Sequence, residues 1–159
     1  MGVRIEGYDG MMRYLRKGVQ RIVDDFQNDL LDLGKRSYVY VLNNLKAIGI
    51  QDRTGNLRSS IGFVFVKDGK IVGRGGFDRV DGPQRSKTTV DGSKEGQELA
   101  ENLAKDYPKG YALIVVVGMQ YAVYLQSVED KDILASGESY LKKELKKLIA
   151  EYNRKYGKK

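Results

Sequence analysis

The sequence predicts an α+β domain in which helices at both ends of the chain enclose a small antiparallel sheet. Three observations predict this class. Apolar residues recur at helical spacing near both ends, short apolar runs of strand composition occupy the middle, and these runs follow one another in neighbouring pairs. The 159 residues fit a single domain over 1–159 that buries a core of its own.

A long helix is expected from about Tyr8 to Ile48. Its first apolar stripe is formed by Leu15, Val19, Ile22, Phe26, Leu30 and Leu33. Such a helix, if uninterrupted, is about 60 Å long. Gly18 and Gly34 weaken it, and we expect a bend at Gly34. Gly49 then ends the helix.

About four strands are expected. The runs 61–66 and 71–77 are separated by an Asp-Gly pair, which favours a tight hairpin because this turn needs positive φ. The glycines of the second run predict a bulge or an edge strand. The most apolar run, 111–118, is expected to be a central strand, with 121–128 as its partner.

Two shorter helices complete the expected fold. One is capped by Ser93 and ends near Lys105, with Leu99 and Leu103 facing inward. The other covers about 136–156. Its buried stripe is expected to be Leu141, Leu145, Leu148, Ile149 and Tyr152.

Residues 78–92 are polar, lack periodicity and predict a mobile loop. Together with side chains off the main stripe of the long helix, this loop supplies candidates for contacts between subunits. The candidates are Tyr14, Leu31 and Tyr40 on the helix, and Arg79, Arg85 and Lys87 in the loop. The alternative for the three helix residues is scattered surface side chains, which are common in monomers.

The composition excludes several kinds of site. The sequence has neither Cys nor His, so it has no disulfide, no thiolate ligand and no imidazole base. A metal site formed only by carboxylates is still possible. No apolar run is long enough to cross a bilayer, and the first ten residues lack the apolar core of a signal peptide. We therefore expect a cytosolic protein without a membrane partner.

The formal net charge of +7 is concentrated toward the last helix. Lys142, Lys143, Lys146 and Lys147 form two pairs at helical spacing there. We favour an ordinary solvated face, and phosphate contact with DNA, without sequence specificity, is the alternative.

Two short motifs carry little weight as catalytic signals. The stretch VGRGGF lacks the Lys-Ser/Thr ending of a phosphate loop. Glu129 and Lys131 match the Glu-x-Lys pair of some magnesium nucleases, but the preceding apolar strand carries no Asp. We expect no catalytic residue, no metal and no cofactor, and a magnesium-dependent nuclease is the weakest alternative.

The segment between the long helix and the first strand is expected to be a structural turn. Thr54 can accept a hydrogen bond from a backbone N–H, and Gly55 can adopt positive φ. Leu57 and Ile61 are expected in the core, with Arg58 facing outward. The turn comprises Arg53, Thr54, Gly55, Asn56, Leu57 and Arg58.

This turn also carries a family resemblance. The stretch RTGNLRSSI, residues 53–61, follows the long helix, and VVVGMQYAVYLQ, residues 115–126, follows later in the chain. The two motifs in this order resemble the gene-product-ten-like family of Hong Kong 97-type phages, which is related to the lambda minor tail protein Z. The chain departs from the family after residue 125, where Gln126-Ser127-Val128 replaces Glu-x-Gly and the Pro-Phe run is missing.

The resemblance implies a non-enzymatic head–tail joining or tail-completion protein at the head-proximal end of a phage or prophage tail. Its implied partners are copies of itself in a ring, expected to be a hexamer, together with the tail tube protein and a head–tail connector protein. The implied locations are the host cytoplasm during assembly and then the virion tail. A basic nucleic-acid-binding module is the alternative function.

Overall fold

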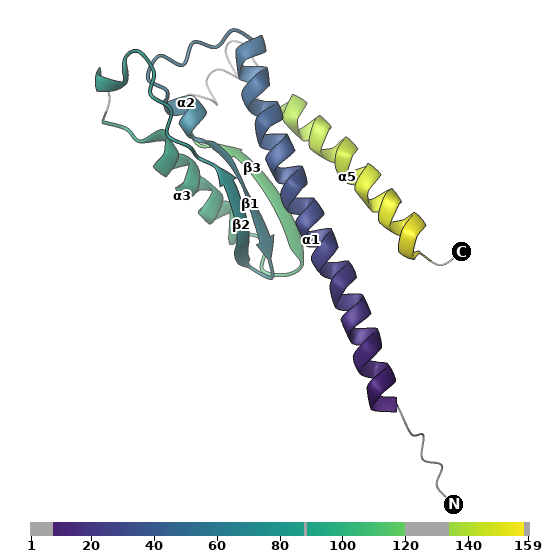
Figure 1. Ribbon diagram of the computed structural model, residues 1–159. Helices are drawn as coiled ribbons and strands as arrows, with labels where there is room; N and C mark the ends of the chain where they lie inside the picture. The colour runs from purple at the N-terminus through teal and green to yellow at the C-terminus, as the bar shows by residue number, and fades with distance from the viewer. Residues whose placement is uncertain (1–7, 88, 120–133, 158–159) are drawn as a thin grey trace, which may run out of the picture.

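The computed structural model describes residues 8–87, 89–119 and 134–157 (Figure 1). The predicted α+β class is confirmed, with a long first helix, an antiparallel sheet and a last helix. The elements in chain order are α1 (Tyr8–Ala47), α2 (Asn56–Ser59), β1 (Ile61–Lys67), β2 (Lys70–Gly76), the 3-10 helix η1 (Arg85–Lys87), α3 (Gly92–Ala104), β3 (Tyr111–Val117) and α5 (Ala135–Tyr156).

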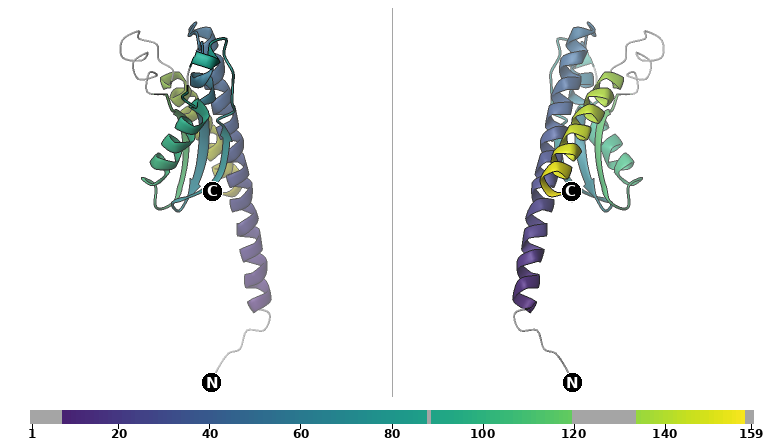
Figure 2. Two further views of the ribbon diagram at one scale, coloured as in Figure 1. Left: turned by 90° about the vertical axis from the view of Figure 1, so that its left-hand side faces the viewer. Right: turned by 90° about the vertical axis from the view of Figure 1, so that its right-hand side faces the viewer.

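The sheet has the strand order β2-β1-β3 with both pairings antiparallel. Helices α1 and α5 lie on one face of this sheet and α3 lies on the other (Figures 1 and 2). Among the described strands β1 is the central one, and residues 61–66 are buried throughout, as expected of a strand covered on both faces. The fourth strand predicted at 121–128 lies outside the described residues.

The β1–β2 hairpin confirms the turn prediction. Asp68 and Gly69 have φ values of 48° and 77°, the left-handed conformation that a tight hairpin turn requires. The predicted irregularity of the second strand is also confirmed, because the pairing register shifts between Phe65 and Val66.

Helix α1 is one uninterrupted helix of 40 residues and shows no sharp kink along its length (Figures 1 and 2), so the bend predicted at Gly34 is wrong. Gly34 has a packing role instead. A Cβ at this position would overlap the ring of Phe63 on β1. The missing side chain therefore lets the helix backbone approach the sheet.

Helix α3 approaches the sheet through small residues, which periodicity of large apolar residues did not reveal. Gly96 and Ala100 are buried, whereas Leu99 lies exposed, so the inward orientation predicted for Leu99 is wrong. Leu103 is partly buried and packs against the core as expected. The residue that caps this helix is Asp91, two residues before the predicted Ser93, and its carboxylate accepts a hydrogen bond from the Ser93 N–H at 3.1 Å.

Helix α5 lies along α1 and runs in the opposite direction (Figure 1). Aromatic contacts join the two helices. The rings of Phe26 and Tyr152 are 5.0 Å apart, and those of Tyr40 and Tyr140 stack at 4.4 Å. The predicted buried stripe of α5 is confirmed in part, since Ile149 is exposed while its other members are partly buried.

Candidate functional site

Residues 52–60, here called the corner, lie between α1 and β1 and confirm three predictions about single residues. Gly55 has φ 83°, and a Cβ there would overlap the carbonyl oxygen of Val80. The Thr54 hydroxyl oxygen accepts a hydrogen bond from the Asn56 N–H at 3.4 Å. Leu57 is fully buried as predicted. The corner is therefore a compact turn that requires glycine.

Asp52 holds this turn, a role that the sequence prediction missed. Its carboxylate accepts hydrogen bonds from the backbone N–H groups of Leu57 and Arg58 at 3.3 and 2.9 Å. The Arg58 guanidinium also donates to it at 3.2 Å and covers it, so the Asp52 side chain is only 5% exposed. The outward orientation predicted for Arg58 is thus wrong, because two-thirds of its side chain is buried in this ion pair.

Asn56 and Ser59 attach the loop 78–92 to the corner. The Asn56 side-chain oxygen accepts hydrogen bonds from the Arg85 guanidinium and from the Gly92 N–H at the start of α3. The Ser59 hydroxyl oxygen accepts one from the Val80 N–H at 2.8 Å. The corner, the loop 78–92 and the start of α3 are therefore held together by two short polar side chains.

These contacts change the interpretation of the loop candidates. Arg85 was predicted to contact another subunit, but its side chain is engaged within the subunit and is 20% exposed. Arg79 is exposed and lies beside Asp81. Lys87 ends η1, and its side chain lies outside the described residues. Whether the loop is mobile stays a prediction.

The first fifteen residues of α1, 8–22, extend beyond the sheet and beyond the end of α5 (Figure 2). We call this segment the arm. Most of its large apolar side chains are exposed, whereas Met12 and Ile22 are partly buried. Met11, Leu15 and Val19 are 55%, 51% and 62% exposed, and the interface candidate Tyr14 is 79% exposed. The arm is thus an amphipathic helix whose apolar side faces solvent.

The other two helix candidates are used inside the subunit, contrary to the prediction that they lie off its packing surfaces. Leu31 is partly buried, and a Cβ at Gly73 on β2 would overlap its side chain. Tyr40 stacks on Tyr140 of α5. The apolar stripe passes gradually around the helix, so residues away from its centre still meet the sheet or α5.

The arm is also basic. It carries four cations, Arg13, Arg16, Lys17 and Arg21, against one carboxylate, Asp9. No ion pair reaches these four cations within the part of the chain that the structure describes. By contrast, Arg36 in the same helix pairs with Asp32 at 3.0 Å and with Glu144 of α5 at 3.4 Å.

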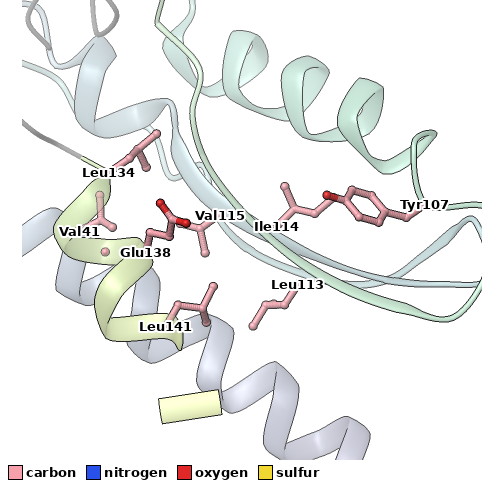
Figure 3. A pocket seen from close by; sticks show the side chains of 9 residues that line it. Val41, Tyr107, Leu113, Ile114, Val115, Leu134, Glu138 and Leu141 are labelled. Carbon is pink, nitrogen blue, oxygen red and sulfur yellow. The ribbon is translucent and has the colours of Figure 1, made fainter. Parts of the chain in front are cut away.

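A cavity of about 290 Å³ lies between α1, β3 and α5 (Figure 3). Apolar side chains such as Val41, Leu113 and Leu141 line most of it. Its carboxylate, Glu138, pairs with Lys142 on the same helix. A single ion-paired carboxylate among apolar side chains offers no acid–base pair.

The described residues contain no group of three or more acidic side chains arranged to hold a metal ion. Glu129 and Lys131, the pair considered for a magnesium nuclease, lie outside the described residues. The glycines of VGRGGF belong to β2, where Gly73 and Gly75 make room for Leu31 and Phe63. Close packing, and not phosphate binding, accounts for them.

Comparison with protein-family models, with curated proteins and with solved structures gave no match. Within the described ranges, no helix has the length and apolar character that crossing a membrane requires.

Proposed function

We propose that the chain is a non-enzymatic structural component of a phage or prophage virion that joins tail to capsid at the head-proximal end of the tail. The observation that carries this proposal is the arm, a helical extension with exposed Leu15 and Val19 that nothing described in the subunit covers. Contiguous exposed apolar surface of this kind marks interaction sites in soluble proteins. The motifs RTGNLRSSI and VVVGMQYAVYLQ supply the family resemblance.

The corner fits such a role because an assembly protein needs a fixed shape. Asp52, Asn56 and Ser59 bind backbone groups from both sides of the turn and from the loop 78–92. The angle between α1 and the sheet is thereby fixed, and so is the direction in which the arm points. In the proposed particle, copies of the chain form a ring, expected to be a hexamer, between the tail tube protein and a head–tail connector protein. Assembly takes place in the host cytoplasm before the ring becomes part of the virion tail.

The test is assembly of particles with an altered arm. Leu15→Asp combined with Val19→Asp changes two exposed side chains and should leave the subunit folded, yet particles should accumulate as full heads without joined tails. Val39→Asp is the matched control, since Val39 lies on the same helix with 49% exposure but outside the arm. Electron microscopy that finds normal tailed virions containing the arm variant would reject the proposal.

A basic nucleic-acid-binding module is the second candidate. It is favoured by Lys143 and Lys146, exposed on α5 without an ion pair among the described residues, and by the cations of the arm. Such a module should shift a DNA probe with steep salt dependence, because each phosphate contact releases counterions. Lys143→Gln with Lys146→Gln should then weaken the shift and reduce its salt dependence.

A further inference from the structure

The apolar side chains of the arm continue a seam that α5 covers only at its far end. Met12, Leu15, Val19, Ile22 and Phe26 are spaced alternately by three and four residues, the repeat of a helix that pairs with another helix. Phe26 contacts Tyr152 near the end of α5, with ring centroids 5.0 Å apart. The N-terminal part of α1 extends past that end (Figure 1).

The shape of the molecule around this seam favours a helix as the missing partner. Helix α5 lies against the same side of α1 that carries the seam, as the contact between Phe26 and Tyr152 shows. A flat surface, such as a bilayer, would meet α5 before it could lie along the arm. A single helix placed in line with α5 meets no such obstacle, and Gly18 beside the seam has no neighbouring atom within 4 Å.

The charge of the arm favours an acidic partner. Four cations and one carboxylate give residues 8–22 a net charge of +3. Arg16 directly follows Leu15 and so flanks the seam, in the position where paired helices exchange charge contacts. A second arm would bring together two segments of net charge +3, with an Arg16 from each copy beside the seam, whereas a helix with carboxylates at its flanks would offset this charge.

We propose that the arm is the docking site for an acidic amphipathic helix of a partner protein, seated in line with α5 on the seam from Met12 to Ile22. This inference deepens the proposed assembly function, on which it rests, by naming the chemistry of the segment that the arm binds. The apolar ridge of the partner helix covers Leu15 and Val19, and its carboxylates lie beside Arg16.

The test uses two synthetic peptides of three heptads, both with Leu at positions a and d, one with Glu and the other with Lys at positions e and g. Fluorescence anisotropy with the full chain should show the Glu peptide binding at least about tenfold more tightly than the Lys peptide. Raising the NaCl concentration from about 50 to about 500 mM should weaken this binding. Val19→Glu should abolish it, whereas Val39→Glu should leave it unchanged.

Three results would overturn the inference. The first is equal binding, or no binding, of the two peptides. The second is reversible self-association of the chain in sedimentation experiments that Val19→Glu abolishes, which would assign the seam to a second copy. The third is binding to phosphatidylglycerol vesicles that the same substitution abolishes, which would assign it to a lipid surface.

The peptide result and the particle result are separable. If arm variants block tail joining but the Glu peptide does not bind, the assembly function stands and the acidic partner is rejected. If the Glu peptide binds at the arm but particles with Leu15→Asp and Val19→Asp assemble normally, the binding site stands and the proposed assembly function is rejected.

Discussion

Residues 8–22 and residues 23–47 of α1 belong to one helix and differ in what surrounds them. In the second segment Leu33 and Val41 are fully buried, and Arg36 is ion-paired. In the arm, Leu15 and Val19 occupy the same apolar stripe but are more than half exposed. The difference shows that an apolar stripe predicts a helix without indicating which part of it the domain itself covers.

The two glycines of α1 show the same contrast. A side chain at Gly34 would overlap Phe63, whereas Gly18 has open space around it. Glycine inside a helix costs roughly 1 kcal/mol relative to alanine. At Gly34 close packing against the sheet offsets that cost, and at Gly18 the described subunit supplies no such contact.

The largest expected effect tests the contrast between covered and uncovered leucines. Leu33→Ala should lower the free energy of unfolding by about 2–5 kcal/mol, because it leaves a cavity in the core. Leu15→Ala should change it by less than about 0.5 kcal/mol, because the side chain is exposed. Urea unfolding followed by circular dichroism measures both, and a large loss for Leu15→Ala would mean that the free subunit covers its arm.

Alanine substitutions at Gly34 and Gly18 should change the stability of the protein in opposite directions. Gly34→Ala should destabilise the protein by about 1–3 kcal/mol, because the added methyl group forces Phe63 to move. Gly18→Ala should stabilise it by up to about 1 kcal/mol through helix propensity. Melting temperatures of the two variants and of the parent protein measure both effects. Destabilisation by both substitutions would contradict the account.

Substitutions at Gly49 and Gly55, which follow α1, distinguish the effect of backbone strain from that of steric overlap. Both have positive φ, but only a side chain at Gly55 meets a neighbour within 4 Å, the backbone of Val80. Gly55→Val should destabilise the fold by about 1–3 kcal/mol, and Gly49→Val should cost less. Equal losses in chemical denaturation would show that the overlap at the corner contributes nothing.

The smallest expected effect is a pH dependence at the contact between Tyr152 of α5 and Asp29 of α1. Burial raises the pKa of Tyr152, as do its 2.6 Å hydrogen bond to Asp29 and the negative charge there. A folded-state pKa above the unfolded value of about 10 means that this contribution is complete below that pH and is lost as the pH rises through the folded value. Melting temperatures from about pH 8 to pH 11 should therefore fall less steeply for Tyr152→Phe than for the parent protein.

Local signals in the sequence were sufficient for much of the fold. The period of apolar residues located α1 and α5, and the Asp68-Gly69 pair located the hairpin, because these features depend on neighbours within a few residues. Gly55 was predicted for the same reason. The small-residue face of α3 could not be predicted, since glycine and alanine carry no apolar signal until a partner strand is known to lie against them.

The candidate interface was predicted less well than the fold. Of the three helix candidates, Tyr14 is exposed as proposed. Leu31 and Tyr40 are used inside the subunit, whereas Leu15 and Val19 are uncovered although they belong to the main stripe. Helical periodicity gives the side of the helix on which a residue lies. How far along α1 the sheet and α5 reach depends on tertiary packing, which the periodicity does not give.

The most direct test of the account is amide hydrogen exchange along α1, measured in the free chain and in purified tails that contain it. In the free chain, residues 8–22 should exchange much faster than residues 26–45, because no described tertiary contact protects the arm. In tails, the arm should become protected to a similar degree as the rest of the helix. Strong protection of the arm in the free chain, or an arm that exchanges equally fast in tails, would contradict the claim that this segment is an assembly surface.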